Sequence, residues 1–386
     1  MSARPASAQD ALGGRRLRAG IVGGGRGAFI GAVHRMAAEL DGEALVVAGA
    51  MSSDPGIARS SAAAWYLERS YDSFAAMARA EAGRPDGIDF VIVATPNHLH
   101  YPVAKAFLES GIAVICDKPL THALADAEAL ATLVERSGRP FALTHVYTGY
   151  PMVREARERV RRGDLGAIRK VLVEYHQDWL LEPLERGANK QAAWRTDPER
   201  AGLGGAVGDI GTHAQNLLEY VTGTAISALS ADLSSFVAGR TLDDDANMLL
   251  HLEGGAKGIL SCSQIACGEE NRLSLRVHGA TAALEWHQQE PNTLLLKRAG
   301  EPWERLRTGA PALSPSAASR LPAGHPEGYL EAFATLYRAF IADLRRHARG
   351  EPLQGGYPNV HDGVRGMRFI QTAVESSRLG AKWLPL

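Results

Sequence analysis

The stretch that most constrains the fold is a glycine-rich loop directly after a short apolar run. Residues 17–22 read LRAGIV, and residues 23–31 follow as GGGRGAFIG before a helical stretch. A strand, a glycine loop and a helix in this order bind a dinucleotide pyrophosphate, because glycine permits close backbone approach and a helix N-terminus favours negative charge. Gly23 and Gly25 fit the first two positions of G-x-G-x-x-G, and Ala28 occupies the third. A glycine-rich turn without a ligand is the alternative that this stretch alone leaves open.

Strand-like and helix-like stretches continue to alternate through the first part of the chain. Further apolar runs stand at 44–51, 88–95, 112–116 and 141–146, with helical stretches at 102–110 and 123–137. Continuously apolar runs are typical of strands buried on both faces, and the alternation favours a doubly wound parallel sheet. We therefore expect an α/β Rossmann dinucleotide-binding domain over residues 17–146.

The pattern changes after residue 150. Residues 168–179 form a long, partly alternating strand, and six more strand candidates follow with no helices between them. These candidates lie at 226–236, 246–252, 258–265, 273–277, 282–286 and 293–296. Such spacing predicts an α+β domain over residues 147–386, with a large, mostly antiparallel sheet and closing helices at 328–347 and 363–379 that are able to pack back on the first domain. We expect this domain to bind the substrate. One face of its sheet would stay open, and we expect that face to join a homodimer or homotetramer.

Bulk composition excludes several other classes. A length of 386 residues favours two domains, and a net charge of -1 argues against a nucleic-acid partner. Three cysteines, Cys116, Cys262 and Cys267, make neither a disulfide framework nor a zinc motif. The first sixteen residues are small and polar, so we expect a disordered tail and no secretory signal. No apolar run reaches membrane-spanning length, and we expect a cytoplasmic protein without a membrane partner.

The end of the second strand bears on the choice between NAD and NADP. An acidic residue there would grip the adenosine ribose of NAD, but the run reads Met-Ser-Ser-Asp-Pro and Asp54 stands far along it. Ser52 and Ser53 would bond a ribose hydroxyl or a 2′-phosphate, or serve as ordinary turn residues, and Arg59 is near enough to matter for NADP. No arginine directly follows the strand, so we expect NAD and do not exclude NADP.

Two later stretches carry residues suited to proton handling. Lys118 lies in CDKP at the end of the run 112–116, where a doubly wound sheet binds its ligands. Asp209 and His213 stand four residues apart in GDIGTH, so a helix would place them on one face. Histidine titrates near working pH and takes a proton readily from an alcohol. The alternative is that Asp209 is a helix N-cap and His213 an interior histidine. Cys116, which lies beside the lysine stretch, is interpreted as a buried core thiol and not as a nucleophile.

Taken together, four motifs resemble one family. GGGRGAFIG, TPNHLH at 95–100, CDKP at 116–119 and GDIGTH at 208–213, in this order and spacing, are similar to the Gfo/Idh/MocA family of NAD(P)-dependent oxidoreductases. Glucose–fructose oxidoreductase and inositol dehydrogenases typify that family. The motifs cover residues 17–221, and the later sheet and terminal helices agree in layout.

This resemblance implies roles residue by residue. The family's Glu-Lys-Pro signature falls on Asp117, Lys118 and Pro119, with Lys118 as the catalytic lysine, and its D-x-x-x-H motif falls on Asp209 and His213. The cofactor-binding residues that we assign are Gly23, Gly25, Ala28, Phe29, Ser52, Ser53, Thr95, Pro96, Asn97, His100, Asp117, Lys118, Trp194 and Arg195.

Two departures from the family pattern stand out. Asp117 replaces the usual glutamate and is one methylene shorter, and Asn216 stands where many members carry aspartate after the histidine. The first bears on how the lysine is positioned, and the second on substrate contacts.

Hydride transfer is the chemistry these residues permit. His213 would be the general base and Lys118 would stabilise the alkoxide of a secondary alcohol on a sugar, sugar derivative or cyclitol. The substrate-binding residues that we assign are Lys118, Tyr147, Tyr150, His176, Asp178, Asp209, His213 and His325, with Gln177 and Trp179 as further candidates. We expect no metal.

Two other functions are compatible with the same scaffold. One is glycoside cleavage by redox cycling with a retained cofactor. The other is a non-enzymatic, cofactor-dependent sugar sensor, although a sensor does not need Lys118, Asp209 and His213 together.

Overall fold

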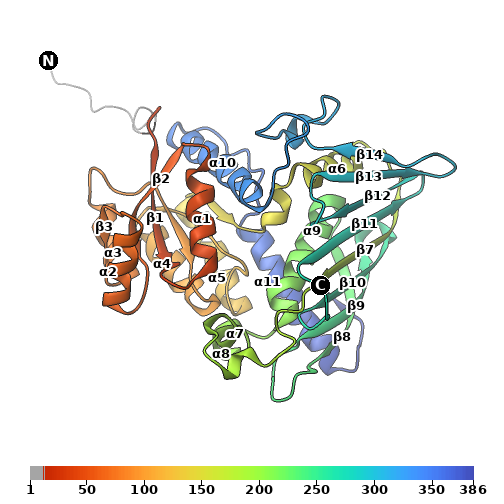
Figure 1. Ribbon diagram of the computed structural model, residues 1–386, viewed down its shortest axis with the longest axis horizontal. Helices are drawn as coiled ribbons and strands as arrows, with labels where there is room; N and C mark the ends of the chain where they lie inside the picture. The colour runs from red at the N-terminus through yellow and green to blue at the C-terminus, as the bar shows by residue number, and fades with distance from the viewer. Residues whose placement is uncertain (1–11, 13) are drawn as a thin grey trace. The chain divides into compact units, whose positions relative to one another are not determined.

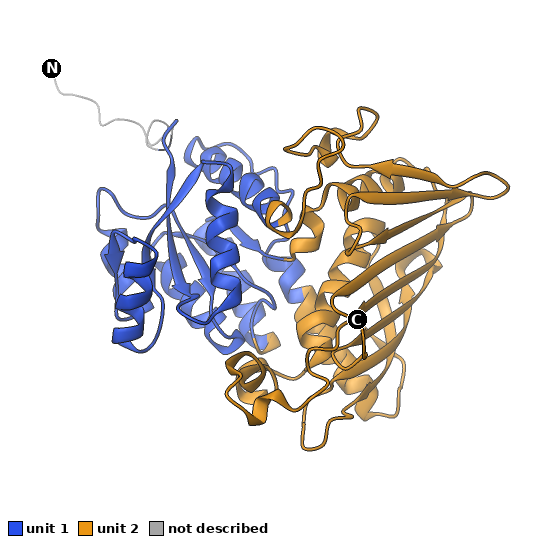
Figure 2. Ribbon diagram, viewed as in Figure 1, with its two compact units in different colours: residues 1–121, 125–144, 333–364 blue, residues 122–124, 145–332, 365–386 orange. Residues whose placement is uncertain are grey.

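A computed structural model describes residue 12 and residues 14–386, and the chain divides into two compact units (Figures 1 and 2). The first unit comprises the residues up to Thr121, Ala125–Thr144 and Phe333–Val364, and the second comprises His122–Leu124, His145–Ala332 and Arg365–Leu386. Of the predicted disordered tail, residues 1–11 and residue 13 lie outside the described residues. Of the later tail residues, Arg15 forms an ion pair with Asp89 at 2.6 Å.

The first unit is built on a six-stranded parallel sheet in the order β3-β2-β1-β4-β5-β6, which is the Rossmann strand order. Its strands are β1 Leu17–Gly23, β2 Ala44–Ala50, β3 Arg69–Ser70, β4 Phe90–Ala94, β5 Ala113–Cys116 and β6 Phe141–Leu143. Its helices are α1 Phe29–Leu40, α2 Pro55–Ala64, α3 Phe74–Ala82, α4 His100–Glu109 and α5 Leu124–Ser137, of which Leu124 itself falls in the second unit. Every residue of β4 and β5 is buried, because helices cover both faces of the sheet.

The second unit is built on a nine-stranded sheet in the order β14-β13-β12-β11-β7-β10-β9-β8-β15. Its strands are β7 Ile168–His176, β8 Ile226–Ser234, β9 Asp245–Leu252, β10 Lys257–Ser263, β11 Arg272–Gly279, β12 Ala282–His287, β13 Thr293–Arg298, β14 Glu304–Arg307 and β15 Leu384–Pro385. Its helices are α6 Pro151–Arg161, α7 Lys190–Arg195, α8 Pro198–Ala201 and α9 Thr212–Thr222. All neighbouring strands pair antiparallel except β7 and β10, which run parallel.

One face of this sheet carries the core of the second unit. Along β7, Val171, Val173 and Tyr175 are buried, whereas the residues that alternate with them are only partly covered or exposed. Helices α6 and α9 pack against the buried face (Figure 1). Period-two alternation of this kind is what one covered face and one open face require.

Two long helices, α10 Tyr329–Ala348 and α11 Val360–Arg378, each contain a boundary between the units. Phe333–Val364 belongs to the first unit, although it follows the second unit's strands in the chain. The sequence pattern had grouped all of residues 147–386 together.

The predicted fold class is confirmed, while several element bounds differ from the expected ones. The apolar run 141–146 is a strand only to Leu143, because the chain then turns into a short 3₁₀ helix, Val146–Gly149. The sequence pattern did not single out α2, α3, β3, β14 or β15; β3 and β15 are two residues long, and β14 reads ERLR. In the part of the chain described here, no helix combines the length and the apolar character needed to cross a membrane.

Candidate active site

The glycine loop is packed against the ends of two neighbouring strands of the first unit. Gly23 has a φ of +81°, and a Cβ on it would lie 2.4 Å from the carbonyl oxygen of Ala94 at the end of β4. A Cβ on Gly25 would lie 2.6 Å from the carbonyl oxygen of Met51, just past β2. Only glycine fits these contacts, so the loop backbone itself forms the surface between the carboxyl ends of the strands.

Helix α1 begins at this loop with backbone donors suited to an anion. Ala28 is its N-cap, and among the described residues no side chain caps the helix and no acidic residue stands in its first turn. The loop is fixed from the side by Ser61, whose Oγ accepts a hydrogen bond of 3.0 Å from the Arg26 backbone N–H. Phe29, the first helical residue, has 67% of its surface exposed. A pyrophosphate would fit the charge and geometry of this helix start.

The residues after β2 are turn residues with local partners. Ser52 Oγ accepts from the Asp54 N–H at 3.1 Å, and the Asp54 carboxylate accepts from the Ile57 N–H at 2.8 Å as the N-cap of α2. Asp54 therefore organises the following helix, and Ser53 is exposed on the turn.

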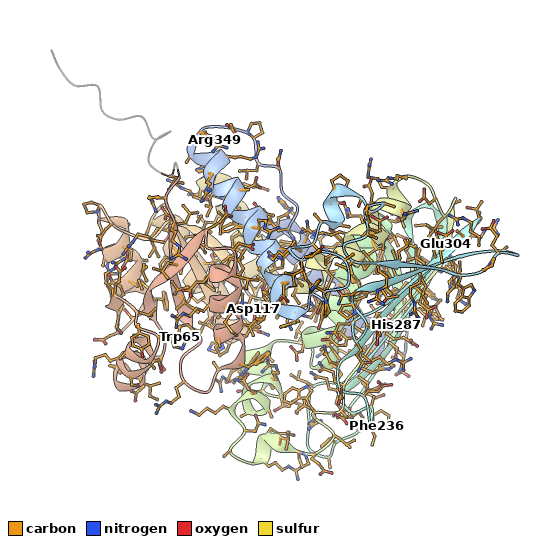
Figure 3. The ribbon with its side chains drawn as sticks, turned by 45° about the horizontal axis from the view of Figure 1, so that its top comes forward. Trp65, Asp117, Phe236, His287, Glu304 and Arg349 are labelled. Carbon is orange, nitrogen blue, oxygen red and sulfur yellow. The ribbon has the colours of Figure 1, made fainter. Side chains whose placement is uncertain are left out.

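The carboxylate of Asp117, which is partly buried, organises the turn that follows β5 (Figure 3). Its Oδ1 accepts a hydrogen bond of 2.8 Å from Thr144 Oγ1, and its backbone N–H donates to the carbonyl oxygen of Val93 at 2.9 Å. His34 of α1 places Nε2 at 3.8 Å from the same oxygen, an ion-pair rather than a hydrogen-bond distance, and its Nδ1 lies 2.7 Å from the Tyr337 hydroxyl of α10. Burial acts to raise the pKa of Asp117, but His34 and the nearby positive charge hold it below its ordinary value.

Lys118 and the TPNHLH loop adjoin this carboxylate. Lys118 is half-buried and joined to Pro119 by a cis peptide bond. His100 is buried, and its two ring nitrogens lie 2.7 Å from the Pro119 carbonyl oxygen and 2.9 Å from that of Thr95. The imidazole thus ties the loop 95–100, with Pro96 preceding a 3₁₀ turn Asn97–Leu99, to the lysine turn.

In the second unit, Asp209 lies in a π-helical turn, Val207–Gly211, that precedes α9. The Thr212 N–H reaches back to the Val207 carbonyl oxygen, five residues earlier. The α-helix expected across GDIGTH therefore begins only at Thr212, and Asp209 is not its N-cap. Such turns are frequent at functional sites because they re-aim side chains within a helix.

Asp209 is held by two donors from other segments. Its Oδ2 accepts from Arg195 Nε at 3.2 Å and from Gln264 Nε2 at 2.9 Å. The Arg195 guanidinium stacks over the Trp194 ring at 4.2 Å and also donates to Gln191 Oε1 at 2.7 Å. Trp194 and Arg195 of α7 thus belong to the surroundings of Asp209.

The π turn itself is anchored by another partly buried carboxylate. Asp243 accepts hydrogen bonds of 2.7 Å from the backbone N–H groups of Gly205 and Val207. Burial raises the pKa of Asp243 to about 6, although these two donors act in the opposite direction. The contacts fix the start of the segment that carries Asp209 and His213.

His213 is buried in a cluster of aromatic and histidine rings. Tyr147 contacts it edge-on at a centroid distance of 4.9 Å, and Tyr175 of β7 lies at 6.3 Å. The Tyr147 and Tyr175 hydroxyls bond to each other, and Tyr175 donates to Asn271 Oδ1 at 2.7 Å. The imidazole therefore stands beside a network of hydroxyl and amide groups of the kind that recognises a polyol.

The remaining predicted substrate residues lie in several places. Tyr150 packs in the core against Trp286 at 5.5 Å, and burial raises its pKa. His176 alternates with Tyr175 along β7, and its Nε2 lies 3.1 Å from Ser261 Oγ on the opposite face from His213. Asp178 accepts from the Gly268 N–H, and His325 is exposed in a loop. Tyr150 also stacks on Tyr147 of the His213 cluster at a centroid distance of 6.3 Å, whereas the structure does not place His176, Asp178 and His325 in that cluster.

The structure also shows the surroundings of two further substrate candidates, Gln177 and Trp179, and of Asn216. Gln177 donates to Asn271 Oδ1 at 2.6 Å, and Trp179 lies under the Arg195 guanidinium at 5.8 Å. Asn216 is buried on α9, one turn after His213.

Sequence reasoning missed four residues of the second unit, namely His145, Tyr175, Gln264 and Asn271. Tyr175 was visible only as a core residue of an alternating strand. The other three follow strand ends or lie in loops, and no spacing relates them to the motif at 208–213, so only the folded chain reveals them.

Comparison with known proteins agrees with this architecture. Residues 17–145 match the model of the oxidoreductase family with an NAD-binding Rossmann fold, and residues 153–285 match the GFO/IDH/MocA C-terminal domain.

Three relatives illustrate the likeness. The uncharacterized oxidoreductase YfiI of Bacillus subtilis is 34% identical, with 95% of this chain and 96% of that protein covered. An inositol dehydrogenase homolog from Azotobacter vinelandii, crystallised with NAD⁺, is 36% identical with a TM-score of 0.93, covering 97% of this chain and 98% of that one; the homolog was also crystallised with NADH and myo-inositol. Levoglucosan dehydrogenase of Pseudarthrobacter phenanthrenivorans is 27% identical, with 75% and 78% covered.

These matches span residues of both units. The resemblance seen in the sequence is thereby confirmed, together with the Rossmann domain and its NAD cofactor. The chain belongs to the GFO/IDH/MocA family of NAD-binding oxidoreductases.

Proposed function

We propose that this protein is an NAD-dependent dehydrogenase that oxidises a secondary alcohol of a cyclitol or sugar, or reduces the corresponding ketone. The observation that carries the proposal is its likeness to the Azotobacter vinelandii homolog bound to NADH and myo-inositol, at 34% identity and a TM-score of 0.89 over 97% of this chain. Levoglucosan dehydrogenase, a relative that acts on an anhydrosugar, supports the same substrate class.

The first unit would hold the cofactor through the glycine loop and the N-terminus of α1. Bound NAD⁺ supplies a hydride acceptor. Gly23 and Gly25 would let the backbone approach the pyrophosphate, and Ser52 and Ser53 would meet the adenosine ribose. NAD is favoured over NADP because no arginine directly follows β2.

His213 and Lys118 would divide the proton chemistry between them. His213 takes the hydroxyl proton of the alcohol, and the Lys118 ammonium donates a hydrogen bond to the same oxygen as negative charge develops on it. Asp209, held by Arg195 and Gln264, would bond the substrate or orient the imidazole.

The first prediction concerns these two groups. Lys118→Met and His213→Gln keep side-chain size while removing the charge or the base. Each should lower the kcat of NADH formation with myo-inositol by about 10²- to 10³-fold, because each removes stabilisation of the transition state. The measurement is absorbance at the NADH band, over a panel of cyclitols, free sugars, anhydrosugars and glycosides with NAD⁺ and NADP⁺.

Matched controls are Lys105→Met and His361→Gln, whose side chains are 43% and 63% exposed. Both should retain wild-type turnover. Wild-type turnover in Lys118→Met or His213→Gln would contradict the assigned roles. Release of sugar from a glycoside without net NADH would indicate redox cycling instead, and cofactor binding without turnover would indicate a sensor.

A second prediction follows from Asp117, which we propose positions Lys118. Its carboxylate has a depressed folded-state pKa, so its stabilising effect is present above the ordinary carboxyl range and is lost as the pH falls through the folded-state value. Asp117→Asn should therefore lower the free energy of unfolding by about 1–3 kcal/mol at pH 7. The difference from wild type should shrink below about pH 4.

Urea unfolding at pH 7 and at about pH 2.5 to 3, below the ordinary carboxyl pKa, measures this difference. The control is Asp72→Asn, where an exposed ion pair with Arg59 at 3.4 Å is worth little. A difference that stays constant across this pH range would show that Asp117 does not act through its charge.

We also propose that the open face of the nine-stranded sheet joins copies of the chain. Leu172, Ile259 and Leu249 are direct neighbours across β7, β10 and β9 and form an apolar row on that face. The row on one side of it contains Lys170, Lys257, His251 and His278, and the row on the other side contains Glu174, Ser261, Asn247 and Asp232. A two-fold axis along the apolar row would oppose the basic row of one copy to the acidic row of the other.

The third prediction tests this face by its central side chain. Ile259→Asp should convert a dimer or larger assembly into a monomer, because it buries a charge in the apolar row. Sedimentation velocity at micromolar concentration reads the mass. Leu353→Asp, at another exposed leucine, is the control and should leave the mass unchanged. A monomeric wild type, or an Ile259→Asp variant of unchanged mass, would contradict the interface.

A further inference from the structure

Two buried imidazoles face each other in the second unit. His145 precedes the 3₁₀ helix Val146–Gly149, and His213 is the second residue of α9. Their Nδ1 atoms lie 3.4 Å apart, and their rings meet edge-on at 84° with centroids 5.2 Å apart. Only 2% of His145 and 6% of His213 is exposed. No sequence motif draws attention to His145.

The contact between two Nδ1 atoms constrains where the protons are. A neutral imidazole carries one proton, on either Nδ1 or Nε2. Protons on both Nδ1 atoms would collide, and two facing lone pairs would repel, so the contact is satisfied by one shared proton. That proton belongs either to His145 or to His213.

These two arrangements have opposite consequences for catalysis. If His145 donates, His213 carries its own proton on Nε2 and cannot accept another there. If His213 donates, its Nε2 carries a lone pair in place of a proton and is able to take the proton of an alcohol. Only the second arrangement makes a general base of the nitrogen that points away from His145.

We propose that His145 is a positioning residue that selects the base form of His213: its Nδ1 accepts the Nδ1–H of His213. The inference rests on the proposed dehydrogenase function and adds a residue to it. As the alcohol is oxidised, its hydroxyl proton moves to His213 Nε2 and the hydride leaves its carbon for NAD⁺. The imidazolium so formed keeps donating its Nδ1–H to neutral His145, and no proton moves to His145.

The other groups around His213 are compatible with this role. The Tyr147 ring meets it edge-on and the Tyr175 ring lies tilted to it, and their hydroxyls are bonded to each other and to Asn271. Asp209, four residues before His213, has its Oδ2 engaged by Arg195 and Gln264. His145 thus supplies an acceptor whose position is independent of that carboxylate, in the way that outer partners fix the tautomer of functional histidines.

A pair of similar variants separates positioning from packing. In His145→Asn the amide oxygen lies near the position of the histidine Nδ1 and still accepts the hydrogen bond from His213. In His145→Gln the amide oxygen lies near the position of Nε2, so it does not replace that acceptor. The full-length His145→Gln protein should lose about 10- to 100-fold in kcat, and His145→Asn should retain most of it. The acidic limb of the kcat/KM profile should move to lower pH in His145→Gln, because the imidazolium loses its acceptor.

The substrate-independent measurement is the tautomer of His213 by ¹⁵N NMR of protein labelled at histidine, assigned with His213→Gln. The expected result for neutral His213 is a proton on Nδ1 in wild type and His145→Asn, and a mixture of tautomers in His145→Gln. A proton on Nε2 in wild type, or variants that match wild type in tautomer and pH profile, would overturn the proposal. A wild type that oxidises no polyol would remove the proposed function but leave this tautomer result to decide the hydrogen bond.

Discussion

The Rossmann unit depends on one partly buried carboxylate just after β5. Asp117 accepts from Thr144 beside β6, adjoins His34 of α1, and through that histidine is linked to Tyr337 of α10. A buried carboxylate is costly unless opposite charge and donors surround it, so helices and strands from distant parts of the chain must meet there. The lysine turn that we assign to catalysis is therefore part of the core of the unit. His34 Nε2 lies 3.8 Å from the carboxylate of this acid, which is one methylene shorter than the family's usual glutamate.

In the second unit, contacts from several segments position His213 in a similar way. Asp243 anchors the backbone before the π turn, the turn aims Asp209 toward Arg195 and Gln264, and His213 follows among Tyr147, Tyr175 and His145. Each polar group has a partner from a different segment, which holds the side chains in place. We propose that this histidine and the lysine turn of the first unit serve the same reaction.

The sequence predicted those parts of the structure that local patterns encode. The apolar runs predicted most strands of both sheets because one sheet is buried on both faces and the other alternates, and the glycine loop followed from the spacing of Gly23 and Gly25. Contacts between distant segments could not be read in this way. His176 has a side chain suited to substrate binding, yet the alternation of β7 places it on the face opposite Tyr175. His145 belongs to no sequence motif, and only the fold brings it to His213.

The central claim is direct hydride transfer from a substrate carbon, with the proton removed separately by His213. It is tested most directly with myo-inositol deuterated at its carbinol carbons, incubated with the protein and NAD⁺, and mass analysis of the nicotinamide product. Our account predicts one deuterium per NADH formed and a slower reaction than with the unlabelled cyclitol. Unlabelled NADH from the deuterated substrate, with the deuterium in solvent, would contradict it.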